Sequence, residues 1–272
     1  MPIDPVTIIG EILGEPAGSM RNPVNAGYLC PYINSVCTKR GHLIEGPYPV
    51  CSLWRGVKKP ELVCVCPNRF YGADIVNDVL DHAWPGRRPQ NPHIAHEVKM
   101  DGFGKVDFVL ADINPATSAV RNFVSVELQA VDISGSVQSA YSAVTNNQLL
   151  NKRPTFGMNW GNVRKRYVSQ LISKGFFHHH WKARMVAVLQ ESLYNNLLEH
   201  IAFDEMPPSD NSNILFMIYG YSLNELENNY TLSLKRVVGT SHSSLMTGPL
   251  YRQTPDRSKF CEQIVANINK LE

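Results

Sequence analysis

The 272-residue sequence contains no run of the roughly 20 consecutive apolar residues that a membrane-spanning helix requires. Its opening segment, MPIDPVTIIGEILGE, has acidic residues but no lysine or arginine, whereas a secretory signal peptide begins with a basic segment. These two absences argue against a membrane protein and against a secreted one, so we expect a cytoplasmic location. A hydrophobic content of 43% is enough for one large core, alone or with a small appended module.

Acidic residues are missing from a long internal segment. No Asp or Glu occurs from Ile133 to Gln190, whereas Lys and Arg recur along it. Solvated protein faces usually mix charges of both signs. The one-sided charge of this segment therefore favours binding to a polyanion, although the net charge of +2 would not indicate this by itself.

Cysteine is nearly absent outside the N-terminal part of the chain. Five of the six cysteines occur there, namely Cys30, Cys37, Cys51, Cys64 and Cys66. In a cytosolic protein such crowding indicates a metal site before disulfides. Residues 21–70 are also rich in Pro and Gly, and a bound metal would supply the stability that burial alone cannot. We therefore predict an N-terminal metal-binding module, residues 1–72, followed by a larger domain, residues 73–272.

Hydrophobic periodicity gives the expected elements of the fold. Helices are predicted over 6–13, 73–82, 132–148, 162–173, 185–202 and 256–271. Alternating patterns predict strands over 105–113, 122–131, 213–221 and 230–238. The first two of these strands are expected to be neighbours in the core. The predicted fold class is α/β or α+β, a mixed central sheet flanked by helices with the N-terminal module attached.

Two polar residues interrupt the strand predicted over 122–131. Residues two apart on a strand share a face, so Glu127 and Gln129 project together, while Val126 and Leu128 face the opposite core. Asp107, in the preceding strand, is the expected companion of Glu127. Converging carboxylates repel one another unless a cation joins them, and Mg²⁺ prefers oxygen ligands. This layout suits metal-dependent phosphodiester hydrolysis. In the alternative interpretation, these side chains face solvent on a half-exposed strand.

An Asp followed by Glu-x-Lys on the next strand is the pattern of PD-(D/E)XK nucleases, and Gln129 stands here in the lysine position. More widely, the chain resembles the NotI-type restriction endonucleases. Leu128-Gln-Ala-Val-Asp-Ile-Ser-Gly-Ser136 is similar to their I-Q-T-M-D-F-H-G-S segment. Upstream, Cys30-Pro-Tyr32 is similar to the C-P-F of this family, and Cys66-Pro-Asn-Arg69 is similar to its C-P-N-R. Downstream, residues 159–174 are similar to its N-x-x-N-V-x-K-R helix.

The resemblance implies a PD-(D/E)XK nuclease core that carries a small Cys₄ domain. The implied enzyme is a type II restriction endonuclease, a homodimer that cleaves double-stranded DNA with Mg²⁺ at a palindromic, GC-rich site. A cognate DNA methyltransferase would belong to the same system. Carried across by position, Asp107 and Glu127 would ligate Mg²⁺ and Gln129 would hold the nucleophilic water. Glu97, in the helix or turn before the first strand, would be an auxiliary acid.

The same resemblance implies a structural metal ion in the cysteine module. We choose Cys30, Cys37, Cys51 and Cys66 as ligands, since Cys66 lies in the matching C-P-N-R turn. Cys64 remains an alternative, because the cysteine spacings depart from the family's pattern. Four thiolates suit iron or zinc, and the spacing does not separate the two metals.

Basic and amide side chains after the predicted site are candidates for DNA contacts. Arg and Lys pair with guanine and Asn or Gln with adenine, which makes base readers of Gln148, Asn151, Lys152 and Arg153. Phosphate contacts are expected from Arg164, Lys165 and Arg166, for which surface solubility is the competing interpretation. Two rival functions stay open. One is a repair or recombination nuclease of the same superfamily, and the other is a non-catalytic DNA-binding protein with structural carboxylates.

Overall fold

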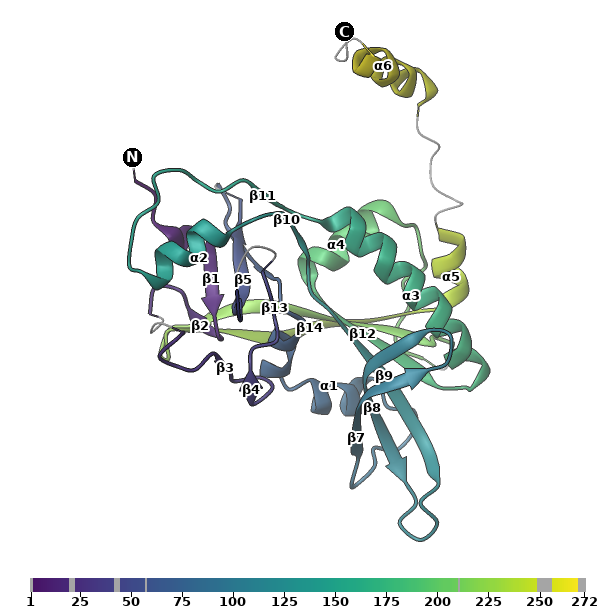
Figure 1. The fold of residues 1–272 in the computed structure, drawn as a ribbon. Coiled ribbons are helices and arrows are strands. Elements are labelled where there is room, and N and C mark those ends of the chain that lie inside the picture. The colour runs from purple at the N-terminus through teal and green to yellow at the C-terminus, as the bar shows by residue number, and fades with distance from the viewer. Residues whose placement is uncertain are drawn as a thin grey trace.

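A six-stranded mixed sheet forms the centre of the computed structural model, which describes residues 2–19, 23–41, 45–56, 58–209, 211–248 and 256–268 (Figure 1). The strand order is β14-β13-β12-β9-β8-β7. The central strands β9, β12 and β13 run parallel, and the outer pairs are antiparallel. The strands are β7 (His93–Met100), β8 (Gly104–Ile113), β9 (Val120–Gln129), β12 (Arg184–Gln190), β13 (Ile214–Asn224) and β14 (Asn229–Thr240).

Helices cover both faces of this sheet, as the predicted fold class requires (Figure 1). One face packs against α1 and the 3-10 helix η2, through strand residues such as Val126 and Leu128. The other face packs against α3 and α4, through residues such as Ala187 and Phe216. The helices are η2 (Pro67–Gly72), α1 (Ile75–His82), α3 (Trp160–His180), α4 (Glu191–His200) and α5 (His242–Thr247).

The N-terminal part forms a second, smaller antiparallel sheet in the order β2-β1-β5-β6. Its core includes residues of α2, and Ile3 forms a β-bridge with Leu150. The sheet therefore shares its core with a segment far beyond residue 72, and the division of the chain at that residue stays a prediction. The elements are η1 (Pro5–Thr7), β1 (Ile9–Ile12), β2 (Glu15–Pro16), β3 (Leu29–Cys30), β4 (Ser35–Val36), β5 (Val50–Arg55), β6 (Glu61–Cys64) and α2 (Gln138–Thr145).

A buried ion pair connects the N-terminal sheet to the central one. Arg69 of η2 donates to the Glu11 carboxylate of β1 at 2.9–3.2 Å, and both side chains are almost fully buried. The same guanidinium donates to the Tyr230 carbonyl oxygen at 2.5 Å, while the Tyr221 hydroxyl donates to Glu11 at 3.0 Å. Three segments far apart in sequence thus meet at one charge pair.

Most of the long predicted elements are confirmed, and the exceptions have physical causes. The helix predicted over 6–13 is wrong, because Ile9–Ile12 is a fully buried strand paired with β5. The first half of the helix predicted over 185–202 is also wrong. Arg184–Gln190 is a parallel strand buried on both faces, and its continuous apolar run has no period that separates it from a buried helix.

The helix predicted over 132–148 begins later than expected. Ile133–Gly135 instead forms strand β10, paired with β11 (Phe156–Met158). Gly135 has a φ of +76°, and a Cβ there would lie 2.4 Å from the Thr155 carbonyl oxygen. This close approach of two backbones explains why the segment after β9 contains a glycine and cannot be helical.

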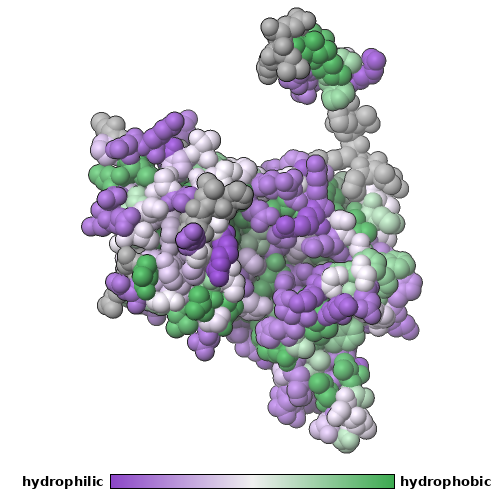
Figure 2. Space-filling model, in the orientation of Figure 1, coloured by the Kyte–Doolittle hydropathy of each residue, from purple (hydrophilic) through white to green (hydrophobic). Residues whose placement is uncertain are grey.

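The closing helix is confirmed as α6 (Arg257–Ile268), which contributes no buried residue. Apolar side chains of this helix, among them Phe260 and Ile264, are exposed. Figure 2 shows hydrophobic surface on this helix. Within the described ranges, no helix combines the length and the apolar character needed to cross a membrane.

Candidate active site

The three residues predicted on β8 and β9 lie close together. The strands pair with Phe108 opposite Val126, and the Leu128 amide donates to Asp107 Oδ2 at 2.6 Å. Glu127 is 7% exposed and Gln129 is 9% exposed. The alternative interpretation, in which these two side chains face solvent, is therefore wrong.

Glu127 projects from β9 toward α3, on the face opposite Val126 and Leu128. Lys174 of α3, which belongs to the basic segment from Ile133 to Gln190, meets it there. The Lys174 ammonium donates to Glu127 Oε1 and, at 2.6 Å, to the Lys105 carbonyl oxygen. Lys174 is 2% exposed, so a complete ion pair lies inside the protein.

A sequence signal for Lys174 does exist. The buried side of α3 follows a helical stripe of Val163, Tyr167, Leu171, Lys174 and His178. A lysine on such a stripe must bury its ammonium group, and buried ammonium groups require an acidic partner. The stripe could therefore have indicated a carboxylate opposite Lys174, although not which one.

Burial raises the pKa of both carboxylates of the site. Desolvation raises the pKa of Glu127 to about 7, against the lowering effect of Lys174 and with a smaller raising effect of Asp107. Burial also raises the pKa of Asp107, although the Leu128 amide and Lys174 favour its charged form. A cation between the two carboxylates would reverse both effects.

Tyr167 adds a polar group to this site. It is fully buried on α3, one helical turn before Leu171. Its phenol interacts electrostatically with Glu127 and Asp107. Within the described part of the chain, its hydroxyl has no hydrogen-bond partner. Buried hydroxyls are normally satisfied, so this one points to a polar ligand or water at the carboxylates.

Glu97 is not where the sequence predicted it. It belongs to strand β7 and not to a helix or turn, at the position between His96 and Val98, which pair with Phe108 and Val106. Its φ is +54°, and its carboxylate pairs with Lys105 at 3.1 Å. It nevertheless contributes to raising the pKa values of Asp107 and Glu127, so it lies within electrostatic range of both.

The raised pKa of Glu127 predicts a pH effect on stability in buffer without divalent cations. The folded value of about 7 exceeds the ordinary value of 4.5, so the stabilising contribution is present below pH 4.5 and is lost as pH rises through 7. The loss is on the order of 3 kcal/mol. Denaturant titrations of the native protein and Glu127→Gln should diverge over this range. Parallel curves would contradict the expected shift.

The cysteines are all buried apart from Cys261, but they do not form a recognisable metal site. Across the described residues, no three His, Cys, Asp or Glu side chains are grouped so that they could hold a metal ion. The predicted Cys₄ site is thus not supported by the geometry. Burial raises the pKa of the Cys37, Cys51 and Cys66 thiols, and the Cys66 thiol interacts electrostatically with Cys30, Cys37 and Cys51.

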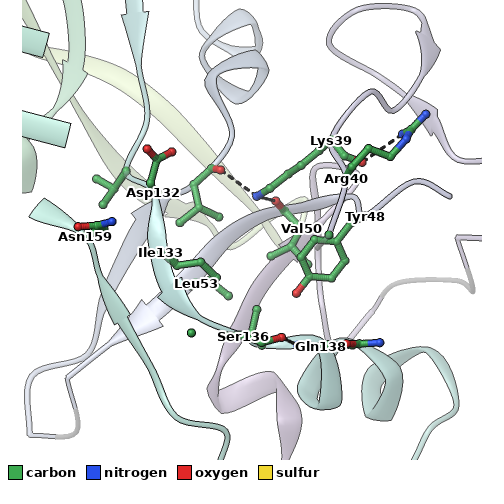
Figure 3. A pocket seen from close by; sticks show the side chains of 15 residues that line it. Lys39, Arg40, Tyr48, Val50, Leu53, Asp132, Ile133, Ser136, Gln138 and Asn159 are labelled. Carbon is green, nitrogen blue, oxygen red and sulfur yellow. Dashed lines mark hydrogen bonds between the residues drawn. The ribbon is translucent and has the colours of Figure 1, made fainter. Parts of the chain in front are cut away.

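Cys64 differs from the other cysteines in the core to which it belongs, and Lys39 places a buried ammonium group near the thiols. Cys64 packs in the core of the central sheet with Phe70, whereas Cys30 and Cys37 belong to the N-terminal core. The Lys39 ammonium donates to the carbonyl oxygens of Val50 and Val65 at 2.7 and 2.8 Å, and it interacts electrostatically with several of the thiols. Its position is drawn in Figure 3.

A cavity of about 590 Å³ lies between this region and the segment that follows β9 (Figure 3). One wall comes from Lys39, Tyr48 and Leu53, and the other from Asp132 and neighbouring residues up to Gln138. The cavity therefore joins the cysteine region to the Asp-Ile-Ser-Gly-Ser segment that directly continues the strand of Glu127.

The predicted DNA contacts fall into two groups. Gln148, Asn151, Lys152 and Arg153 are exposed in the segment between α2 and β11. On α3, Lys165 is exposed, but Arg164 donates to Asn196 of α4 at 3.0 Å, and Arg166 pairs with Asp132 at 3.1 Å. The α3 arginines thus have partners within the protein, while the α2–β11 segment presents its side chains to solvent.

Comparison with known proteins gives one family. The family model described as restriction endonuclease NotI matches residues 23–232, a span that includes the cysteines up to Cys66, β8 and β9, and α3. No curated protein matches the chain.

Proposed function

Since the chain belongs to the NotI restriction endonuclease family and is a type II site-specific deoxyribonuclease, we propose that it cleaves both strands of double-stranded DNA at a palindromic, GC-rich site in a Mg²⁺-dependent reaction. The observation that carries the proposal is the pair of carboxylates, the half-buried Asp107 and the buried Glu127, on the paired strands β8 and β9. The Tyr167 hydroxyl, which has no hydrogen-bond partner among the described residues, lies within electrostatic range of both. Mg²⁺ needs only one or two protein carboxylates when substrate phosphate completes its shell.

The residues of the site divide the chemistry among them. Asp107 and Glu127 would hold the metal, which when bound supplies a water of lowered pKa and neutralises charge on the phosphate. Gln129 would hold the attacking water through its amide, and Glu97 would serve as an auxiliary acid. The water oxygen bonds to phosphorus while the bond to the 3′ oxygen breaks. The water gives its proton to solvent, and the leaving oxygen takes one up.

DNA recognition is proposed for the exposed segment between α2 and β11. Lys152 and Arg153 carry the donors that pair with guanine, and Gln148 and Asn151 can read adenine. Lys165, with Arg164 and Arg166, would approach the phosphates. A palindromic target follows if two identical subunits meet identical half-sites as a homodimer. We place the enzyme in the cytoplasm, with a cognate methyltransferase that protects the host's DNA.

We also propose a structural iron or zinc ion held by Cys30, Cys37, Cys51 and Cys66 in the N-terminal module, residues 1–72. The support is that these four thiols are buried and that the Cys66 thiol interacts electrostatically with the other three. Cys64 instead packs in the core of the central sheet. Thiolates in a dry site require a cation, which a metal would supply.

Metal analysis of the purified protein tests this second proposal. We expect about one equivalent of iron or zinc per chain, lost in Cys66→Ser together with thermal stability. Cys261→Ser is the matched control, since Cys261 lies on α6 and outside the module. Visible absorbance would distinguish ferric iron from zinc. Native protein without either metal would overturn the proposal.

Cleavage of a long, defined DNA tests the enzymatic proposal. With Mg²⁺ we expect discrete fragments whose ends map to one sequence, and with EDTA we expect none. Nicking that follows DNA structure instead of sequence would favour the repair or recombination nuclease. Binding without cleavage would favour the non-catalytic DNA-binding protein.

A further inference from the structure

Lys174 is a buried cation in the middle of the proposed nuclease site. Its ammonium carries three N–H groups, and among the described residues it donates to two acceptors, Glu127 Oε1 and the Lys105 carbonyl oxygen. The first acceptor belongs to β9 and the second to β8. The lysine therefore bridges the two strands that supply Asp107 and Glu127.

Burying an ammonium ion is costly, so its presence here needs a reason. Lys174 lies on the buried stripe of α3 between Leu171 and His178, and it forms a buried ion pair with Glu127. Well-packed apolar replacements of buried ion pairs are often neutral or stabilising. Stability alone therefore does not account for a lysine at this position.

Gln129 cannot provide a charge at the site. It stands two residues after Glu127, where the nuclease pattern has lysine, and its amide nitrogen donates to the adjacent Ala130 carbonyl oxygen at 2.5 Å. Its side chain is thus anchored to the backbone and neutral. A cationic group reaches the same carboxylate from the helix packed over the strand.

We propose that Lys174, carried by α3, supplies the catalytic cation that this chain lacks at Gln129. Two of its N–H groups fix the ammonium against Glu127 and Lys105, and the third is directed to the attacking water or to a non-bridging oxygen of the scissile phosphate. The positive charge stabilises the hydroxide and the charge that develops on the phosphate. This inference rests on the proposed function and assigns the water-activating charge of the same site.

Single-turnover cleavage with Mg²⁺ tests the role of Lys174. Lys174→Gln keeps N–H donors without the charge, and Lys174→Met fills the stripe with an apolar side chain. We expect both to lower the cleavage rate by roughly 10²–10³-fold. The dissociation constant for DNA measured in EDTA should change by less than about threefold, since one buried lysine adds little to phosphate binding. Lys235→Met is the control, because Lys235 is exposed on β14.

A second-site variant separates catalysis from structure. In Gln129→Lys/Lys174→Met the lysine returns to the strand, and we expect at least about a tenfold recovery of the cleavage rate over Lys174→Met. Thermal unfolding of each variant identifies losses that follow instability. Folded Lys174→Gln and Lys174→Met with native cleavage rates would overturn the role of Lys174 alone. A native protein that does not cleave DNA would instead overturn the proposed function.

Discussion

Glu127→Gln is expected to reduce the rate of DNA cleavage by at least about 10³-fold. The substitution keeps the size of the side chain and leaves an amide oxygen for the Lys174 ammonium, but it removes the negative charge that a metal ligand needs. The measurement is single-turnover cleavage of a defined DNA with Mg²⁺, with DNA binding in EDTA as the second readout.

The glutamine variant is more informative than Glu127→Ala. Alanine would leave the Lys174 ammonium buried without its acidic partner, and an uncompensated buried charge costs roughly 3–5 kcal/mol. Loss of activity could then reflect unfolding. Glu225→Gln, in the exposed turn between β13 and β14, is the matched control and should cleave at the native rate. Cleavage by Glu127→Gln within tenfold of the native rate would exclude Glu127 as an essential ligand.

Glu11→Ala is expected to lower the free energy of unfolding by roughly 3–5 kcal/mol, because it leaves the Arg69 guanidinium buried without its carboxylate. For a chain of this size that corresponds to a decrease in Tm on the order of 10 °C. Tyr221 would also lose the acceptor of its hydroxyl. The effect should be large because β1, η2 and β13 all contribute groups to the same buried cluster.

An exposed ion pair in the same sheet provides the comparison. Arg55 and Glu61 lie 3.6 Å apart with side chains 50% and 42% exposed, so Glu61→Ala should cost less than about 1 kcal/mol. Denaturant titration or calorimetry of the two variants measures the contrast. If Glu11→Ala and Glu61→Ala lost similar stability, the buried pair would not hold the two sheets together.

The strands of the site were predictable from local pattern. The alternation of polar and apolar residues predicts that Val126 and Leu128 face one core and that Glu127 and Gln129 lie on the opposite face, as the structure confirms. Where local pattern failed, the cause was burial on both faces, as in β12, or backbone crowding, as at Gly135. Neither cause is visible in the period of the apolar residues.

What the sequence determined by itself is that Glu127 and Gln129 share one face of their strand, because the two-residue repeat of a strand sets the face of each side chain. It could not determine what that face meets. Lys174 is 47 residues from Glu127, and Arg69 is 58 residues from Glu11, so both ion pairs arise only when helices pack on sheets. Burial within that packing also raises the pKa of Glu127, since desolvation depends on every neighbouring segment.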